Sequence, residues 1–153
     1  MILVYSKEVE MHDMETIIIE KDIKVFYITA TSFPDGIQDA HDRLHASIPF
    51  SNERRYFGIS RPEIGVITYK AAAEIVEKDK EGNFNGELFT IEKGKYRCVT
   101  IVNYKNDPQK ISHAFEELIS YSDIDPNGYC VEWYQGNEDL KCMVRLNPSI
   151  EGD

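Results

Sequence analysis

Long apolar runs and paired cysteines are both missing from this sequence. No apolar run approaches the roughly 18 residues that a membrane-spanning helix needs, and the apolar start at residues 1–5 is too short for the core of a signal peptide, so neither membrane spanning nor export is predicted. The three cysteines, Cys98, Cys130 and Cys142, are odd in number and form no Cys-x-x-Cys pair. This argues against a disulfide framework and a zinc knuckle, and it favours a reducing cytoplasm.

Basic residues are also scarce. The chain has 17 Lys and Arg against 27 Asp and Glu, a net charge of -10. A surface that reads phosphates needs clustered Lys and Arg, so nucleic acid is not expected as a direct partner, and the acidic field would repel anionic membranes. Glycine-rich phosphate loops of the GxGxxG and GxxxxGK types are absent, and therefore no cofactor is predicted.

What the sequence does contain is an internal repeat. Ile19-Glu20-Lys21 recurs 72 positions later as Ile91-Glu92-Lys93. Around each copy, two β-like runs flank a short polar segment, which predicts a hairpin in each case, with Gly94 free to adopt a positive φ. These runs span residues 15–20 and 24–30 in the first copy, and 87–92 and 95–102 in the second.

Apolar and aromatic residues at positions i, i+3, i+4 and i+7 predict two amphipathic helices. They are Ile37, Ala40, His41 and Leu44 in the first helix, and Ile111, Ala114, Phe115 and Leu118 in the second. The first helix is expected to open near residues 32–35. In the second, Asp107 is expected to cap free amide groups with its side chain, and Pro108 fits the first helical position.

Two further pairs of extended segments follow the helices, at 55–60 with 65–71 and at 128–134 with 140–146. The charged stretch 77–83 is expected to be a solvated connector. The predicted fold is therefore α+β, in one domain over 1–153 with pseudo-repeats at about 13–76 and 85–147. Two duplicated β-α-β-β units are expected to complete one antiparallel sheet or partly closed barrel, against which both helices pack.

Four segments carry a family resemblance. They are Glu92-Lys93-Gly94-Lys95-Tyr96, Tyr56-Phe57-Gly58-Ile59, the strand Gly128-Tyr129-Cys130-Val131-Glu132-Trp133-Tyr134 and the closing segment Leu140 to Asn147. Together they resemble the Gly-x-Tyr hairpin, the Gly-Ile strand, the glutamate strand and the closing strand of the GyrI-like small-molecule-binding domain. This is also the bacterial effector-binding domain of AraC-type and MerR-type regulators.

The resemblance implies a duplicated β-α-β-β fold. It also implies that an acidic residue with aromatic walls, here Glu132, holds a cationic or amphipathic ligand between the halves. Two departures from the family matter. The final strand ends Leu146-Asn147-Pro148, where members usually carry a proline two residues after an apolar pair, and no DNA-binding domain precedes the module. The second departure argues against a direct role in transcription.

Side chains alternate along an extended strand, so Cys130, Glu132 and Tyr134 are predicted to share one face of the strand at 129–134, and Trp133 lies on the other. An ionised carboxylate that faces inward is costly to bury, and a cationic ligand between aromatic rings would relieve that cost. The predicted ligand-binding residues are Glu132, Tyr134, Phe57 and Tyr69, with Trp133 and Tyr96 close behind. The alternative is that Glu132 lies at a solvated sheet rim and that the rings are ordinary core.

Other chemistry-bearing residues are interpreted more simply. His41 and His45 have a spacing that could hold a metal, but no motif completes such a site, so a partly buried, hydrogen-bonded His41 and no metal are predicted. The cysteines are expected to be small apolar fillers. Charge runs such as Glu53-Arg54-Arg55 are expected to mark solvated faces.

These observations lead to three hypotheses about function. The first is a stand-alone cytoplasmic module that binds a small amphipathic or cationic organic molecule at Glu132. The second is a hydrolase of electrophilic cyclopropane-type toxins, an activity described for some family members, with Glu132 as the acid or base. The third is a protein-binding modulator such as the gyrase inhibitors that give the family its name, and the acidic surface supports it.

Overall fold

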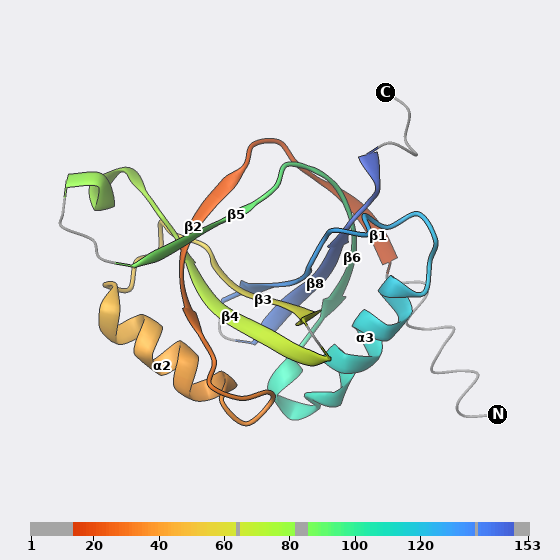
Figure 1. Ribbon diagram of the computed structural model, residues 1–153, viewed down its shortest axis with the longest axis horizontal. Helices are drawn as coiled ribbons and strands as arrows, with labels where there is room; N and C mark the ends of the chain where they lie inside the picture. The colour runs from red at the N-terminus through yellow and green to blue at the C-terminus, as the bar shows by residue number, and fades with distance from the viewer. Residues whose placement is uncertain (1–13, 64, 82–85, 137, 149–153) are drawn as a thin grey trace. The chain divides into compact units, whose positions relative to one another are not determined.

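The computed structural model describes residues 14–63, 65–81, 86–136 and 138–148. Over these residues the element order is β-β-α-β-β twice, and the strands pair antiparallel, so the predicted α+β class is confirmed (Figure 1). The chain forms two compact units. Unit 1 contains the described residues up to Glu20 and from Gly94 onward, and unit 2 spans Lys21–Lys93.

Unit 1 is a four-stranded antiparallel sheet with one helix. Its strands are β1 (Met14–Ile19), β6 (Gly94–Ile101), β7 (Cys130–Gln135) and β8 (Asp139–Arg145), in the order β1-β6-β8-β7. Between β6 and β7 lie the 3-10 helix η2 (Tyr104–Asn106) and α3 (Gln109–Ile119). Helix α3 buries Ala114 and Leu118 against the sheet, because these residues fall on its apolar stripe.

Unit 2 repeats this plan. Its strands are β2 (Ile23–Thr29), β3 (Tyr56–Glu63), β4 (Val66–Glu74) and β5 (Glu87–Ile91), in the order β3-β4-β2-β5. Helix α2 (Ile37–Ser47) lies along one face of this sheet and buries Ala40 and Leu44 there, while the 3-10 helix η1 (Glu77–Glu81) follows β4 (Figure 1). Both predicted amphipathic helices are therefore confirmed.

The two predicted hairpins around the repeated Ile-Glu-Lys tripeptide are wrong. β1 pairs with β6 rather than with β2, so that Ile19 lies opposite Gly94. β5 pairs with β2 rather than with β6, so that Ile23 lies opposite Ile91. The polar segments between these strands carry the chain from one unit into the other instead of reversing it. Each unit therefore takes its edge strand from the other half of the sequence.

Gly94 adopts the positive φ that was expected, at 140°. A Cβ atom at this position would lie 3.0 Å from Nε of Arg145. The backbone conformation therefore favours glycine here, and a larger residue would also press on the Arg145 guanidinium.

Helix α3 begins slightly later than predicted, and its cap differs. Pro108 occupies the N-cap position, and no side chain caps the helix. Asp107 instead accepts a hydrogen bond from the Lys110 amide through its backbone carbonyl, and its own amide bonds to the carbonyl of Tyr104. The reason is that the backbone of Asp107 closes η2, which leaves its side chain outside the capping geometry.

Arg54 is buried rather than solvated, which corrects the prediction for the charge run at 53–55. It is 7% exposed, and its Nη1 atom lies 2.7 Å from Oδ2 of Asp79 and 2.9 Å from the carbonyl oxygen of Glu74. The amide of Val76 also donates to Asp79. The part of the charged connector at 77–81 is thus held to unit 2 through Asp79, which neutralises a buried guanidinium, and residues 82 and 83 lie outside the described residues.

No helix within the described ranges is long and apolar enough to cross a membrane.

Candidate functional site

Glu132 lies on β7, on the sheet face that carries α3. In the antiparallel register it is opposite Cys142 of β8, a member of the apolar core beneath α3. Cys130 and Tyr134, two residues away on either side, pack against the same core. The predicted alternation along this strand is therefore confirmed, and Glu132 is half-buried rather than fully exposed.

Two tyrosines accompany the carboxylate. The Tyr134 hydroxyl donates a hydrogen bond of 2.7 Å to Oε1 of Glu132. Tyr104, from η2, places its ring 5.8 Å from that of Tyr134 at an angle of 58°. Burial, and then the charge of Glu132, raise the pKa of Tyr104. We call Glu132, Tyr134 and Tyr104 the Glu132 site.

Two thiol groups, those of Cys130 and Cys142, lie on the same sheet face as Glu132. Burial, and to a lesser extent the negative charge of Glu132, raise the pKa of Cys130 to about 11 and raise the pKa of Cys142 as well. Both groups are therefore uncharged thiols at neutral pH, which makes them weak nucleophiles. They agree with the prediction that the cysteines are small fillers, with Cys98 and Cys142 fully buried.

Trp133 and Tyr96, which were also predicted to bind the ligand, lie on the opposite face of the unit 1 sheet. Trp133 pairs with Lys141 and Tyr96 pairs with Arg145, and both partners alternate with Cys142 along β8. Trp133 is half-buried and Tyr96 is buried. Within unit 1, only Tyr134 of the predicted aromatic residues therefore joins Glu132.

In unit 2 the register separates the remaining two predicted residues. Tyr69 on β4 faces α2 and is 1% exposed, and its hydroxyl lies 2.9 Å from Nε2 of His41. Phe57 on β3 pairs with Ala72, which places it on the other face, where it is fully buried. The expectation that His41 is a partly buried, hydrogen-bonded histidine is confirmed.

Tyr104 was missed in the sequence because it lies in a short loop segment with no periodicity. Asn103 before it adopts a left-handed conformation (φ 55°) and begins the turn that brings the ring back over the sheet. An asparagine followed by an aromatic residue directly after a predicted strand was the available signal.

The described part of the chain contains no group of three or more His, Cys, Asp or Glu side chains that could hold a metal ion. The chemistry that the Glu132 site offers is therefore that of one carboxylate, phenol hydroxyls and ring faces.

Comparison with known proteins gives a fold and no family. No family model matches the sequence, and no curated protein matches it either. Among solved structures, an integron cassette protein from the mobile metagenome of Vibrio cholerae is similar over 88% of this chain and 96% of its own, with a TM-score of 0.62 and 11% identity. The protein SAV2435, bound to tetraphenylphosphonium, is similar over 91% and 96%, with a TM-score of 0.65 and 12% identity.

A hydrolase from Listeria innocua is also similar, over 94% of this chain and 98% of its own, with a TM-score of 0.56 and 11% identity. At these identities the comparisons establish a shared fold alone. That fold defines a class of small α+β proteins and is consistent with the GyrI-like fold that the sequence resemblance implies.

Proposed function

We propose that this chain is a small-molecule-binding module of the GyrI-like group, and that its Glu132 site captures a lipophilic organic cation. The observation that carries the proposal is the half-buried Glu132 carboxylate, held by the Tyr134 hydroxyl at 2.7 Å and accompanied by the Tyr104 ring. The similar fold of a protein bound to tetraphenylphosphonium supports it.

The physical case depends on desolvation. A half-buried carboxylate loses part of its hydration, and a cation placed against it restores the lost interaction. Each tyrosine ring face adds an attraction of about 0.5 to 2 kcal/mol for a nearby cation. Cations that are themselves weakly hydrated, such as phosphonium and quaternary ammonium ions, lose least on entering a site of this kind.

Titration calorimetry with tetraphenylphosphonium tests the proposal. We expect Glu132→Gln to weaken binding by about tenfold, because it removes one charged partner and keeps the shape of the side chain. Tyr104→Leu should weaken binding by about threefold through the loss of one ring. Glu116→Gln is the matched control, because Glu116 is an exposed glutamate on α3 and its replacement changes the net charge equally. Parental affinity in Glu132→Gln would rule the proposal out.

A second candidate is hydrolysis of an electrophilic cyclopropane-type toxin, and the similarity to a hydrolase favours it. In that case the Glu132 carboxylate would take a proton from water while the water oxygen bonds to a ring carbon and the strained C–C bond breaks. The electron pair of that bond would stay on the other carbon, which would then take up a proton, and the Tyr134 hydroxyl would hold the carboxylate in place. Incubation with such a substrate separates the candidates, since a binding module leaves it chemically unchanged. If the chain is this hydrolase, product should form with the parent and be lost with Glu132→Gln.

A further inference from the structure

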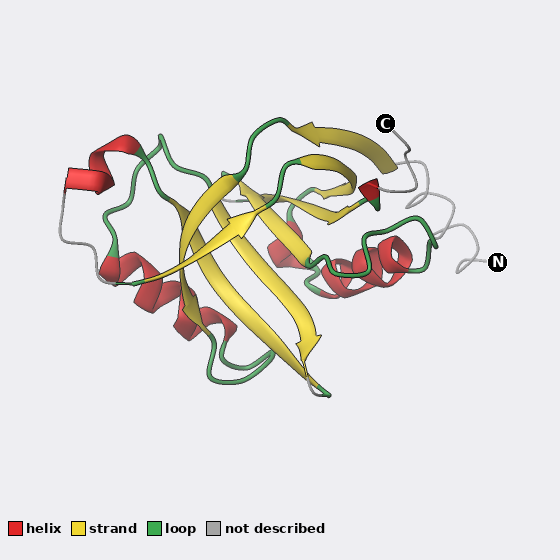
Figure 2. Ribbon diagram, turned by 45° about the horizontal axis from the view of Figure 1, so that its top comes forward, coloured by secondary structure: helices red, strands yellow, loops and turns green. Residues whose placement is uncertain are grey.

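Tyr104 joins the Glu132 site from outside the sheet, because it is the first residue of η2. This 3-10 helix is a short turn shortly before α3 (Figure 2). Two backbone hydrogen bonds close it, from the Asn106 amide to the Asn103 carbonyl at 3.0 Å and from the Asp107 amide to the Tyr104 carbonyl at 3.2 Å. A helical segment of this length has little stability of its own, so contacts with the sheet have to fix the position of the Tyr104 ring.

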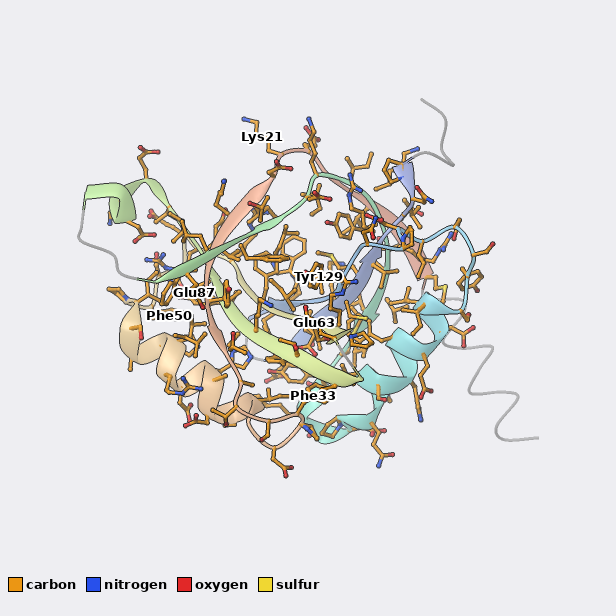
Figure 3. All side chains as sticks on the ribbon, viewed as in Figure 1. Lys21, Phe33, Phe50, Glu63, Glu87 and Tyr129 are labelled. Carbon is orange, nitrogen blue, oxygen red and sulfur yellow. The ribbon has the colours of Figure 1, made fainter. Side chains whose placement is uncertain are left out.

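The end of the β7–β8 hairpin supplies these contacts. Tyr129, labelled in Figure 3, directly precedes β7, and β8 begins at Asp139 after a short connection. The carbonyl oxygen of Glu138 accepts a hydrogen bond of 2.9 Å from the Tyr104 amide. Oδ1 of Asp139 accepts one of 3.2 Å from the Asn103 amide. Two successive amides at the start of η2 are therefore held by two successive residues of the hairpin.

The backbone conformation of Asn103 increases the importance of the Asp139 contact. Asn103 has a φ of 55°, in the left-handed region, which is unfavourable for residues other than glycine, although asparagine tolerates it better than most. The amide of this same residue donates to the Asp139 carboxylate. The carboxylate therefore stabilises the turn at the residue where its backbone is least favourable.

The same hairpin carries Tyr134, against which the Tyr104 ring packs. The two ring centroids are 5.8 Å apart, and both rings pack against the core beneath α3. Asp139 pairs across the hairpin with Gln135, the residue after Tyr134. Burial, and then the charge of Glu132, raise the pKa of Tyr104, so its hydroxyl lies within the electrostatic influence of the carboxylate. The hairpin thus fixes both rings of the Glu132 site, one directly and one through η2.

We propose that Asp139 is a positioning residue of the Glu132 site, which holds the Tyr104 ring against Tyr134 through the Asn103 amide. The consequence for cation binding rests on the proposed function, whereas the position of the ring does not. In this role Asp139 acts through Tyr104 and not by contact with the cation. Its charge is not required, because a neutral oxygen acceptor at the same position can accept the same hydrogen bond.

Two replacements of Asp139 separate positioning from charge. Asp139→Asn keeps an oxygen acceptor and loses the charge, whereas Asp139→Ala loses both. Glu138→Ala is the matched control: its side chain is exposed, and its replacement removes an equal charge one residue away while the carbonyl that binds the Tyr104 amide remains. Because the hydrogen bond between Asn103 and Asp139 is exposed, all three variants should fold.

NOE intensities between the ring protons of Tyr104 and Tyr134 measure the position of the ring without any ligand. We expect parental intensities in Asp139→Asn and in Glu138→Ala. In Asp139→Ala the intensities should fall, because the turn at Asn103 loses one of its two contacts with the hairpin. Parental intensities in Asp139→Ala would overturn the proposal.

Calorimetric titration with tetraphenylphosphonium measures the consequence for binding. We expect Asp139→Ala to weaken binding by about two- to threefold, close to the effect expected of Tyr104→Leu, while Asp139→Asn and Glu138→Ala stay within about 1.5-fold of the parent. When Tyr104 is already leucine, Asp139→Ala should cause no further loss, because the ring through which it acts is gone.

Equal weakening in Asp139→Ala, Asp139→Asn and Glu138→Ala would show an effect of net charge and would overturn the proposal. A full loss from Asp139→Ala in the Tyr104→Leu background would do the same, because Asp139 would then act by another route. Glu132→Gln tests the proposed function separately. If it binds the phosphonium like the parent, the proposed function fails together with the role of Asp139 in cation binding, and the NOE comparison still decides whether Asp139 holds the Tyr104 ring.

Discussion

Arg54 and Asp79 illustrate how one buried ion pair organises a stretch of chain. The side chains are 4% and 11% exposed, and two nitrogen atoms of Arg54 contact the two oxygen atoms of Asp79, at 2.7 and 3.2 Å. The hydrogen bond from Arg54 lowers the pKa of Asp79, so the carboxylate stays ionised. Burying either charge at this position without the other would be strongly destabilising.

Replacement of Asp79 should therefore be costly. We expect Asp79→Asn to lower the free energy of unfolding by about 3 kcal/mol, because it leaves a guanidinium buried without its counter-charge. Urea denaturation measures the change. Asp39→Asn is the control: it removes the partner of Arg43 in an exposed pair, with side chains 44% and 62% exposed, and should cost less than about 0.5 kcal/mol. Equal losses in the two variants would show that burial does not govern the effect.

His41 makes the stability of the chain depend on pH. Burial, and then the charge of His45, lower its pKa to about 4 from the ordinary 6.5. Between these values the unfolded chain binds a proton at His41 and the folded chain does not. The free energy of unfolding should therefore fall as the pH decreases from about 6.5 to about 4, by up to about 1.4 kcal/mol per pH unit.

Urea denaturation at several pH values between 4.5 and 6.5 measures this slope. His41→Gln, which can still bond the Tyr69 hydroxyl, should have a smaller slope than the parent. His113→Gln serves as the control, because His113 lies exposed on α3. If the parent and His41→Gln show the same slope, the buried imidazole is not its source.

At the scale of elements, the exchange of edge strands is the feature that local patterns did not reveal. β1 completes the sheet of unit 1 against β6, and β5 completes that of unit 2 against β2. The Asp22 side chain accepts a hydrogen bond from the Lys93 amide at 2.9 Å, which joins two residues 71 positions apart beside the exchange. Each half of the sequence therefore contributes strands to both units.

Cleavage of the chain between the halves tests this arrangement. A protease site placed between Glu81 and Gly86 divides β1–β4 from β5–β8. We expect the two fragments to elute together in native size-exclusion chromatography, since separating them breaks the β1–β6 and β2–β5 ladders. They should separate in concentrated urea. Separate elution in native buffer would contradict the observed pairing.

At the scale of the whole molecule, the net charge of -10 and the proposed cation binding are connected. A negative field raises the local concentration of cations and leaves that of uncharged ligands unchanged. The proposed cation binding at the Glu132 site would be favoured by this field.

Much of this organisation was readable from sequence because it depends on local geometry. The apolar spacing at 37–44 and 111–118 predicted both helices, since a helix brings every third and fourth residue to one face. Alternation along β7 predicted that Glu132 and Tyr134 share a face. The pairing of Glu132 with Cys142, a residue of the core against which Tyr134 packs, and the hydrogen bond between the two side chains confirm this. These relations follow from the fixed repeat of helix and strand.

Tertiary structure alone decided the rest. Contacts between segments far apart in the chain determine three features: the pairing of the strands, the burial of Arg54 and the approach of Tyr104 to Tyr134. The same applies to Tyr69 and Phe57. The sequence analysis predicted that both line one ligand-binding site, but the β3–β4 register places them on opposite faces of the sheet. Such contacts depend on the free energy of folding of the whole chain. The residues next to a given residue in the sequence contribute only a small part of that free energy.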